Sequence, residues 1–379
     1  MNLSFAYTHS PIEFYFRQSP RDFVVEEVPL YPFSGDGVHL ILKLRKKNLT
    51  TFELLKILSN HLGIKEKDIG YAGLKDKNAL TTQYISIPIS TKTKLESFTH
   101  NAIKILDVTL HNNKIKIGHL KGNKFFIRIK KLYPINAHKI IQVMESITQF
   151  GIPNYFSYQR FGMNGKNYLQ GREIVRKERY VRDVKIRNFL ISAYQSYLFN
   201  AWLSLRIEIS HIIATHNAKD IYNALELHIK SNNIPIIFKD MIYCNLLKSQ
   251  IHPFKILQGD MLCHYPFGRH FVLEDLPRES ERFLIKDIAP TGLLSGKKAI
   301  LSENCAKPFE MAFLDSKIQN VGQRRYAWIF PTSLEFHYKE EEAQGMLNFF
   351  LPRGAYATNL LRELAHREIG DITEEVENV

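Results

Sequence analysis

The segment Gly70-Tyr71-Ala72-Gly73-Leu74-Lys75-Asp76-Lys77-Asn78-Ala79 is the most unusual stretch of this chain. Its two glycines and Ala72 allow the backbone to pass close to a bound molecule or to adopt positive φ. Asp76 stands between two lysines, which favour the ionised carboxylate, so we expect its pKa to lie below the usual value of about 3.9. An ionised aspartate between two cations is suited to act as a nucleophile or general base beside a phosphate backbone. The alternative is a polar hairpin loop with solvated charges.

The composition of the whole chain favours an anionic partner. Its 379 residues include 51 Lys and Arg against 38 Asp and Glu, which gives a net charge of +13. Such a surplus of positive charge fits nucleic acid or an acidic membrane surface. An apolar fraction of 45% excludes general disorder, and the length allows one large domain or two ordinary ones.

Several common chemistries lack their sequence signatures here. The chain contains no phosphate-binding GxxxxGK[ST] loop, no GxGxxG, no HExxH, no CxxC and no GxSxG. Cys244, Cys263 and Cys305 have neither disulfide-framework nor metal-ligand spacing, which is typical of reduced thiols in the cytosol. The N-terminal residues and the lack of a long apolar run lead us to expect no signal peptide and no membrane span. We therefore expect a soluble cytoplasmic protein that uses no metal or cofactor and binds no membrane.

The hydrophobic periodicity predicts an α+β chain, with strands towards both ends and helices between them. Thr50 as the N-cap, Glu53 as its capping-box partner and Gly63 as the stop predict a helix over residues 50–62. Strands are predicted over 38–43, 115–117, 125–129 and 346–351, with a turn at 121–123. Further helices are predicted over 136–151, 171–202, 217–229 and 358–366. The order suggests an α+β domain that is interrupted by an insertion.

The segment around Asp76, with Thr81-Thr82-Gln83 after it, resembles the active-site loop of the TruD family of tRNA pseudouridine synthases. Five further segments resemble motifs of this family and occur in the family's order: residues 19–27, 118–125, 154–162, 289–292 and 351–358. Within the first and third of these segments, Arg21 and Ser157 depart from the residues that are usual in the family.

The resemblance implies an enzyme that isomerises a uridine of tRNA, at position 13, to pseudouridine without a cofactor or metal. Asp76 is then the nucleophile, with Lys75 beside it in the substrate site. It bonds C1′ of the ribose or C6 of the base, or helps remove the C2′ proton to give a glycal. The implied partner is tRNA, and no obligatory protein partner is evident. The alternatives are a non-catalytic basic RNA-binding protein, or a synthase that acts on rRNA or another RNA.

The resemblance also implies the domain organisation. Residues 1–156 and 329–379 are expected to form the pseudouridine synthase catalytic domain, with a mixed or antiparallel sheet. Residues 157–328 are expected to form an inserted α+β TRUD domain.

Four further residues are implied to contact the substrate. Phe23 and Tyr356 would each place a ring against the target base, and Asn123 would bind the base edge or the ribose. Arg17 would pair with Asp76 or with a phosphate. The alternatives are core packing for the two aromatic residues, turn formation for Asn123 and a solvated strand position for Arg17.

A basic segment lies between residues 171 and 187, where seven basic residues meet three acids. Arg172, Arg176 and Arg179 would share one helical face, with Arg182 close by. We expect these four arginines to contact the RNA backbone. The alternative is a solvated helix face.

Overall fold

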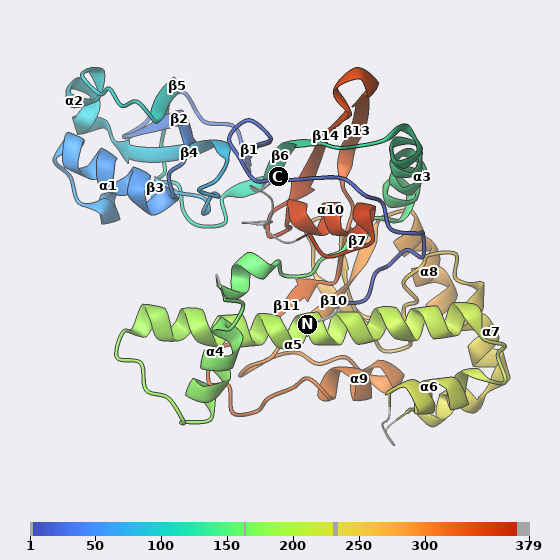
Figure 1. Ribbon diagram of the computed structural model, residues 1–379. Helices are drawn as coiled ribbons and strands as arrows, with labels where there is room; N and C mark the ends of the chain where they lie inside the picture. Colours follow the sequence, from blue (N-terminus) through green and yellow to red (C-terminus); the bar gives the residue numbers. More distant parts are fainter. Residues whose placement is uncertain (1–2, 163, 230–233, 370–379) are drawn as a thin grey trace. The chain divides into compact units, whose positions relative to one another are not determined.

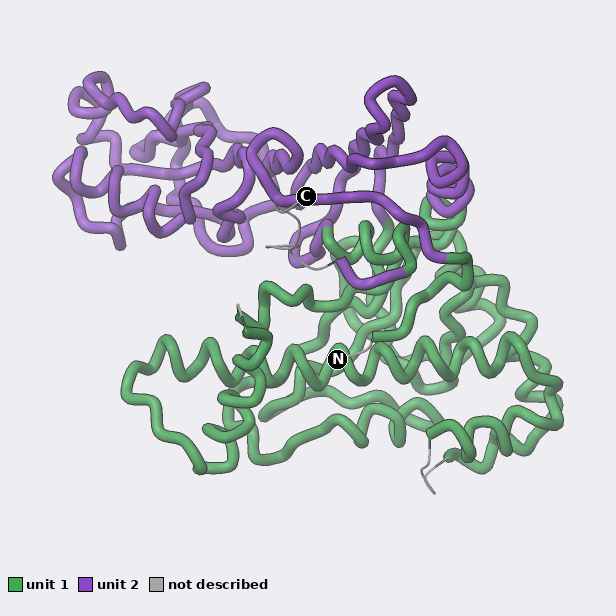
Figure 2. The backbone as a smooth tube through the Cα atoms, in the orientation of Figure 1, with its two compact units in different colours: residues 1–10, 146–330, 358–366 green, residues 11–145, 331–357, 367–379 purple. Residues whose placement is uncertain are grey.

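A computed structural model describes residues 3–162, 164–229 and 234–369 of the chain (Figure 1). The described residues fall into two compact units (Figure 2). Unit 1 lies within residues 1–10, 146–330 and 358–366, and unit 2 within residues 11–145, 331–357 and 367–379. Each unit therefore combines segments that are far apart in the sequence. The domain boundaries expected at 157 and 328 stay a prediction.

Unit 2 is built on an eight-stranded sheet in the order β13-β14-β6-β1-β4-β2-β5, with β3 paired to β4. Only β1 and β4 run parallel, and the other pairs are antiparallel. The predicted α+β class with a mixed sheet is thus confirmed. The strands are β1 (Phe23–Pro29), β2 (His39–Lys47), β3 (Gly70–Tyr71), β4 (Leu80–Pro88), β5 (Ile103–His111), β6 (Leu120–Ile129), β13 (Thr332–Lys339) and β14 (Gln344–Pro352).

The first helix of unit 2, α1 (Thr51–Leu62), begins and ends as its sequence predicts. The Thr50 side chain accepts a hydrogen bond from the backbone of Glu53, whose side chain accepts one from Thr50 in return. Gly63 ends the helix at a φ of 68°. Leu54 and Leu58 pack with leucines of β2, so α1 covers one face of the sheet. The other helices here are α2 (Lys92–Glu96) and α3 (Pro134–Phe150), which continues into unit 1.

The turn predicted at residues 121–123 is wrong, because these residues lie within β6. Gly122 is a strand residue at a close approach of two backbones: a β-carbon there would overlap the carbonyl oxygen of Leu351 in β14. The strand predicted at 115–117 is also absent, since those residues have no regular structure. Asn123 is therefore held by strand pairing, and the turn explanation for it fails.

Unit 1 is organised around the 32-residue helix α5 (Val184–Thr215), whose Phe199, Trp202 and Leu203 lie in an extensive apolar cluster. A four-stranded sheet, β11-β10-β8-β9, and a short β12-β7 pair accompany it. Their bounds are β7 (Ile152–Pro153), β8 (Met261–His264), β9 (His270–Val272), β10 (Ile288–Leu294), β11 (Gln323–Tyr326) and β12 (Trp328–Ile329). The other helices are α4 (Asn167–Val175), α6 (Ile221–Ile229), α7 (Met241–Ser249), α8 (Leu276–Leu284), α9 (Lys307–Met311) and α10 (Ala357–Ala365).

The single helix predicted over 171–202 is wrong, since α4 and α5 are separate there. Lys177 adopts a φ of 64°, and the Glu178 N–H donates to the Glu173 carbonyl, which closes a Schellman motif at the end of α4. Asp183 then caps α5 by accepting hydrogen bonds from Lys185 and Ile186. A left-handed lysine is rare, so the sequence pattern does not reveal this break.

Two further findings concern the cysteines and the length and polarity of the helices. The three cysteines are free and buried. None of the described helices is both long and apolar enough to cross a membrane.

Candidate active site

Asp76 lies in the loop between β3 and β4, and it is half-buried. The two glycines before it do not adopt positive φ, contrary to one of the roles expected for them. A β-carbon on Gly70 would overlap the carbonyl oxygen of Ile115 and the hydroxyl of Ser86, so Gly70 is needed for packing against the chain itself. At Gly73 a β-carbon would have ordinary room.

Buried groups from three elements hold the backbone next to the Asp76 side chain. The hydroxyl of Thr51, at the start of α1, accepts a hydrogen bond from the Lys75 N–H at 2.9 Å. The Lys46 ammonium donates to the Asp76 carbonyl at 3.1 Å. Lys75 Nζ forms an ion pair with Glu27 Oε2 of β1 at 2.5 Å, and the two side chains are 4% and 1% exposed. These contacts therefore fix the backbone on both sides of the Asp76 side chain.

Beneath this loop the sheet carries a buried polar patch, formed by Glu27, Lys46, Thr81, Gln83 and Asn123. Strand register places them on one face, since Lys46 lies opposite Thr81 and Glu27 lies opposite Asn123. All but Asn123 are at most 2% exposed. Among the described residues, Thr81 Oγ1, Gln83 Nε2 and Asn123 Oδ1 are buried without a hydrogen-bond partner. Such atoms are rare in folded proteins, and these three include both a donor and acceptors.

Three of the sequence motifs meet at this site. The Gly118 N–H donates to the Ala72 carbonyl at 2.8 Å, which joins segment 118–125 to the Asp76 loop. The Arg353 side chain donates to the Gly118 carbonyl at 3.0 Å, and the Arg353 N–H donates to Lys121. Arg353 therefore links the end of β14 to segment 118–125, which in turn contacts the Asp76 loop. Tyr356 follows three residues later and is half-buried.

The other predicted substrate residues occupy different environments. Phe23 is 3% exposed, and its ring centre lies 6.0 Å from that of Phe16 and 6.1 Å from that of Phe125. This burial favours core packing, and a substrate contact by Phe23 stays a prediction. Arg17 is exposed and forms no ion pair with the residues that the structure describes. The ammonium group of Lys75 pairs with Glu27, and a substrate contact by Lys75 stays a prediction.

Sequence reasoning missed Lys46, Glu27 and Thr51. A signal for Lys46 was present, because Leu40, Leu42 and Leu44 alternate along β2 and place Lys46 on the same, buried face. The charged run at residues 45–47 instead has the composition of a solvated strand end. Thr51 was hidden by its role as the first residue of a capped helix.

The basic segment in unit 1 does not form the expected helical face. Arg172 lies in α4 and Arg176 caps its end, whereas Arg179 and Arg182 lie in the connection to α5. The last three are exposed, and Arg179 forms a surface ion pair with Glu173 at 3.2 Å. Tyr180 among them is 84% exposed. Their contact with RNA stays a prediction.

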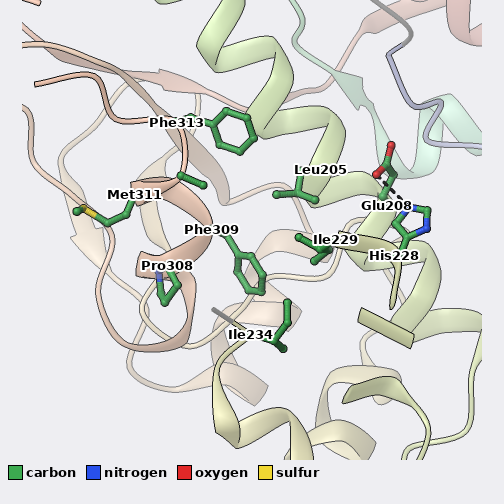
Figure 3. A pocket seen from close by; sticks show the side chains of 10 residues that line it. Leu205, Glu208, His228, Ile229, Ile234, Pro308, Phe309, Met311 and Phe313 are labelled. Carbon is green, nitrogen blue, oxygen red and sulfur yellow. Dashed lines mark hydrogen bonds and ion pairs between the residues drawn. The ribbon is translucent and has the colours of Figure 1, made fainter. Parts of the chain in front are cut away.

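A cavity of about 730 Å³ lies within unit 1, away from all the predicted site residues in sequence (Figure 3). Side chains from α5, α6 and α9 line it, among them Leu205, Ile229 and Phe309. Its polar groups include Glu208 and His228, which pair at 3.1 Å. It contributes none of the residues around Asp76.

Comparisons with known proteins agree with one another. The family model for tRNA pseudouridine synthase D (TruD) matches residues 2–182 and 181–364. The chain is 57% identical to tRNA pseudouridine synthase D of Wolinella succinogenes, over 95% of this chain and 97% of that one. It is 50% identical to the protein of that name from Sulfurimonas denitrificans, over 97% and 100%. A crystal structure described as tRNA pseudouridine synthase D from Methanosarcina mazei, 21% identical, has the same fold with a TM-score of 0.63 over 96% of both chains.

Proposed function

The chain belongs to the tRNA pseudouridine synthase D family, and from this premise we propose that it isomerises uridine 13 of tRNA with Asp76 as the nucleophile. The observation that carries the proposal is the fixed peptide of Asp76 above the buried polar patch. We propose the same two-part organisation that the sequence suggests, with residues 1–156 and 329–379 catalytic and residues 157–328 inserted.

In the proposed reaction the bond between C1′ and N1 of the uridine breaks and a bond between C1′ and C5 forms. The carboxylate of Asp76 bonds C1′ of the ribose or C6 of the base, or takes the C2′ proton in a glycal route. The detached uracil turns so that C5 faces C1′. C5 then loses its proton and N1 carries one, so the product is an isomer of the substrate and no cofactor is consumed.

A stacked uridine must first leave its stack, at a cost of a few kcal/mol. Polar atoms in the site can offset part of that cost by binding the base edge or ribose. Among the polar residues of the patch, Asn123 is only half-buried, and its Oδ1 lacks a partner among the described residues. Tyr356 can supply stacking to the turned-out base, worth about 1–3 kcal/mol.

The role of Tyr356 can be tested by two substitutions. If its ring faces the uracil, we expect Tyr356→Phe to be nearly silent, and Tyr356→Leu to lower kcat/KM by about 5- to 150-fold with little change in Tm. If the ring instead packs in the core, Tyr356→Leu should destabilise the fold by about 1 kcal/mol or more. Turnover and thermal melts on the same proteins distinguish the two. A large drop in Tm with preserved kcat/KM would remove Tyr356 from the site.

The basic segment can be tested by the salt dependence of tRNA binding. Replacing Arg176, Arg179 and Arg182 together by Gln should lower the slope of log K against log salt by about 2–3, if each neutralises one phosphate. Site choice should not change, because phosphate contacts position the RNA without reading its sequence. A variant with the same charge change at the exposed Lys239, Arg278 and Lys317 is the control. Equal slopes for the two triple variants would identify the arginines as a solvated surface.

The proposed function is tested by offering the purified protein unmodified tRNA transcripts and unmodified rRNA together. We expect pseudouridine at position 13 of tRNA and none in rRNA. Modification of rRNA instead would support the alternative substrate. Tight tRNA binding without any pseudouridine would support the non-catalytic RNA-binding alternative.

A further inference from the structure

We propose that Lys46 is a positioning residue for the reaction, because its ammonium group holds the backbone carbonyl of Asp76 and so fixes the direction of the carboxylate. This inference rests on the proposed role of Asp76. It adds a residue that lies outside every motif by which the sequence resembles its family.

The contacts of Lys46 support this role. Lys46 lies near the end of β2, on the face where Leu42 and Leu44 are buried, and it is 1% exposed. Its ammonium donates to the Leu49 carbonyl at 2.5 Å and to the Asp76 carbonyl at 3.1 Å. Leu49 immediately precedes the N-cap of α1. One cation therefore connects the strand, the start of the helix and the reactive loop.

Burial of this lysine is hard to explain by stability alone. Lysine is almost never fully buried, because removing an ammonium group from water is costly. An apolar side chain at this position would continue the alternation of leucines along β2 and would avoid that cost. What an apolar side chain could not do is bind the Asp76 carbonyl, and errors of about 1 Å in a reacting group can cost about 100-fold in rate.

The charge of Lys46 depends on pH in an accessible range. Burial lowers the pKa of Lys46 from the usual 10.5 to about 8, although the negative charges of Asp76 and Glu53 raise it, and Lys75 lowers it further. The ammonium form therefore predominates below pH 8. Above that pH the group loses its charge, and its hydrogen bond to the Asp76 carbonyl becomes weaker.

Activity and stability should respond to this titration in opposite directions. Between about pH 8 and 10.5 the unfolded chain binds more protons at this position than the folded protein does. The contribution of Lys46 to the free energy of unfolding thus rises with pH in that range. Loss of the proton from Lys46 therefore does not itself destabilise the fold.

The test compares Lys46→Met with Lys43→Met in the full-length protein. Lys43 lies on the same strand, but it is partly exposed and pairs with Glu26 at 3.0 Å. We expect Lys46→Met to lower kcat by about 10- to 100-fold. Its KM for tRNA should stay within about threefold, because a buried side chain does not contact RNA. Lys43→Met should keep kcat within about twofold.

The second measurement is the pH profile of the wild-type protein between pH 6 and 9. We expect kcat to fall on the alkaline side with a midpoint near pH 8, and the residual activity of Lys46→Met to be flat there. Urea unfolding in the same buffers should show no parallel loss of stability.

A flat wild-type pH profile of kcat, or a wild-type kcat in Lys46→Met, would overturn the inference. If the variant does not fold, the pH profile of the wild-type protein alone decides. Neither result decides the proposed function, which is tested separately by the products formed on tRNA and rRNA and by Asp76→Asn.

Discussion

Replacing Asp76 by Asn is expected to abolish pseudouridine formation, with a loss of at least about 10,000-fold in kcat. The amide keeps the shape of the side chain but removes its charge and its nucleophilicity. The backbone carbonyl of Asp76 still accepts the hydrogen bond from Lys46. The loop should therefore stay in place, and tRNA binding should remain within a few fold of wild type. Tritium release from tRNA that carries 5-tritiated uridine measures the turnover.

Asp107→Asn is the matched control for that experiment. Asp107 is an exposed aspartate on β5, at the edge of the same sheet. The substitution changes the net charge by the same amount, and we expect it to leave turnover unchanged. Substantial turnover by Asp76→Asn would rule out a nucleophilic role for this carboxylate.

The largest expected effect on stability comes from Glu27. Glu27→Leu removes the partner of Lys75, whose side chain is only 4% exposed, and leaves an ammonium group buried without its counter-charge. Breaking a buried pair in this way costs about 3–5 kcal/mol. The variant should also lose activity, because Lys75 immediately precedes Asp76. Urea unfolding measures the first effect, and tritium release at low temperature measures the second.

The neighbouring Glu26 provides the control for this prediction. Glu26 points to the other face of β1 and pairs with Lys43 at 3.0 Å, where both side chains are partly exposed. Glu26→Leu should therefore cost less than about 1 kcal/mol. Combining Glu27→Leu with Lys75→Met should recover part of the lost stability, since two apolar side chains replace the buried pair. If Glu27→Leu costs no more than Glu26→Leu, the buried pair does not hold the loop.

Local signals explain which parts of the fold could be predicted from the sequence. The helix α1 was predictable at both ends, because Thr50, Glu53 and Gly63 act on their own near neighbours. The turn at residues 121–123 was mispredicted because glycine is needed at position 122 to make room for the carbonyl oxygen of Leu351, more than 200 residues away in the sequence. Likewise, the break between α4 and α5 depends on a left-handed Lys177, a residue type with no special preference for that conformation.

The same distinction applies to the candidate site. The Asp76 loop stood out because its charges and small residues lie within ten consecutive positions. The buried polar patch could not be recognised in the sequence, because Glu27, Lys46 and Asn123 come from three strands and meet only through the register of the sheet. Lys75 could be identified as a neighbour of Asp76, but its pairing with Glu27 depends on that register too.

The most direct test of the account is a map of pseudouridine in total RNA from three strains. One strain has the wild-type gene, one lacks it, and one carries Asp76→Asn at the same protein level. We expect pseudouridine at position 13 of tRNA to be present in the first strain and missing from the other two, with every other site unchanged. Pseudouridine at that position in the strain without the gene, or in the Asp76→Asn strain, would contradict it.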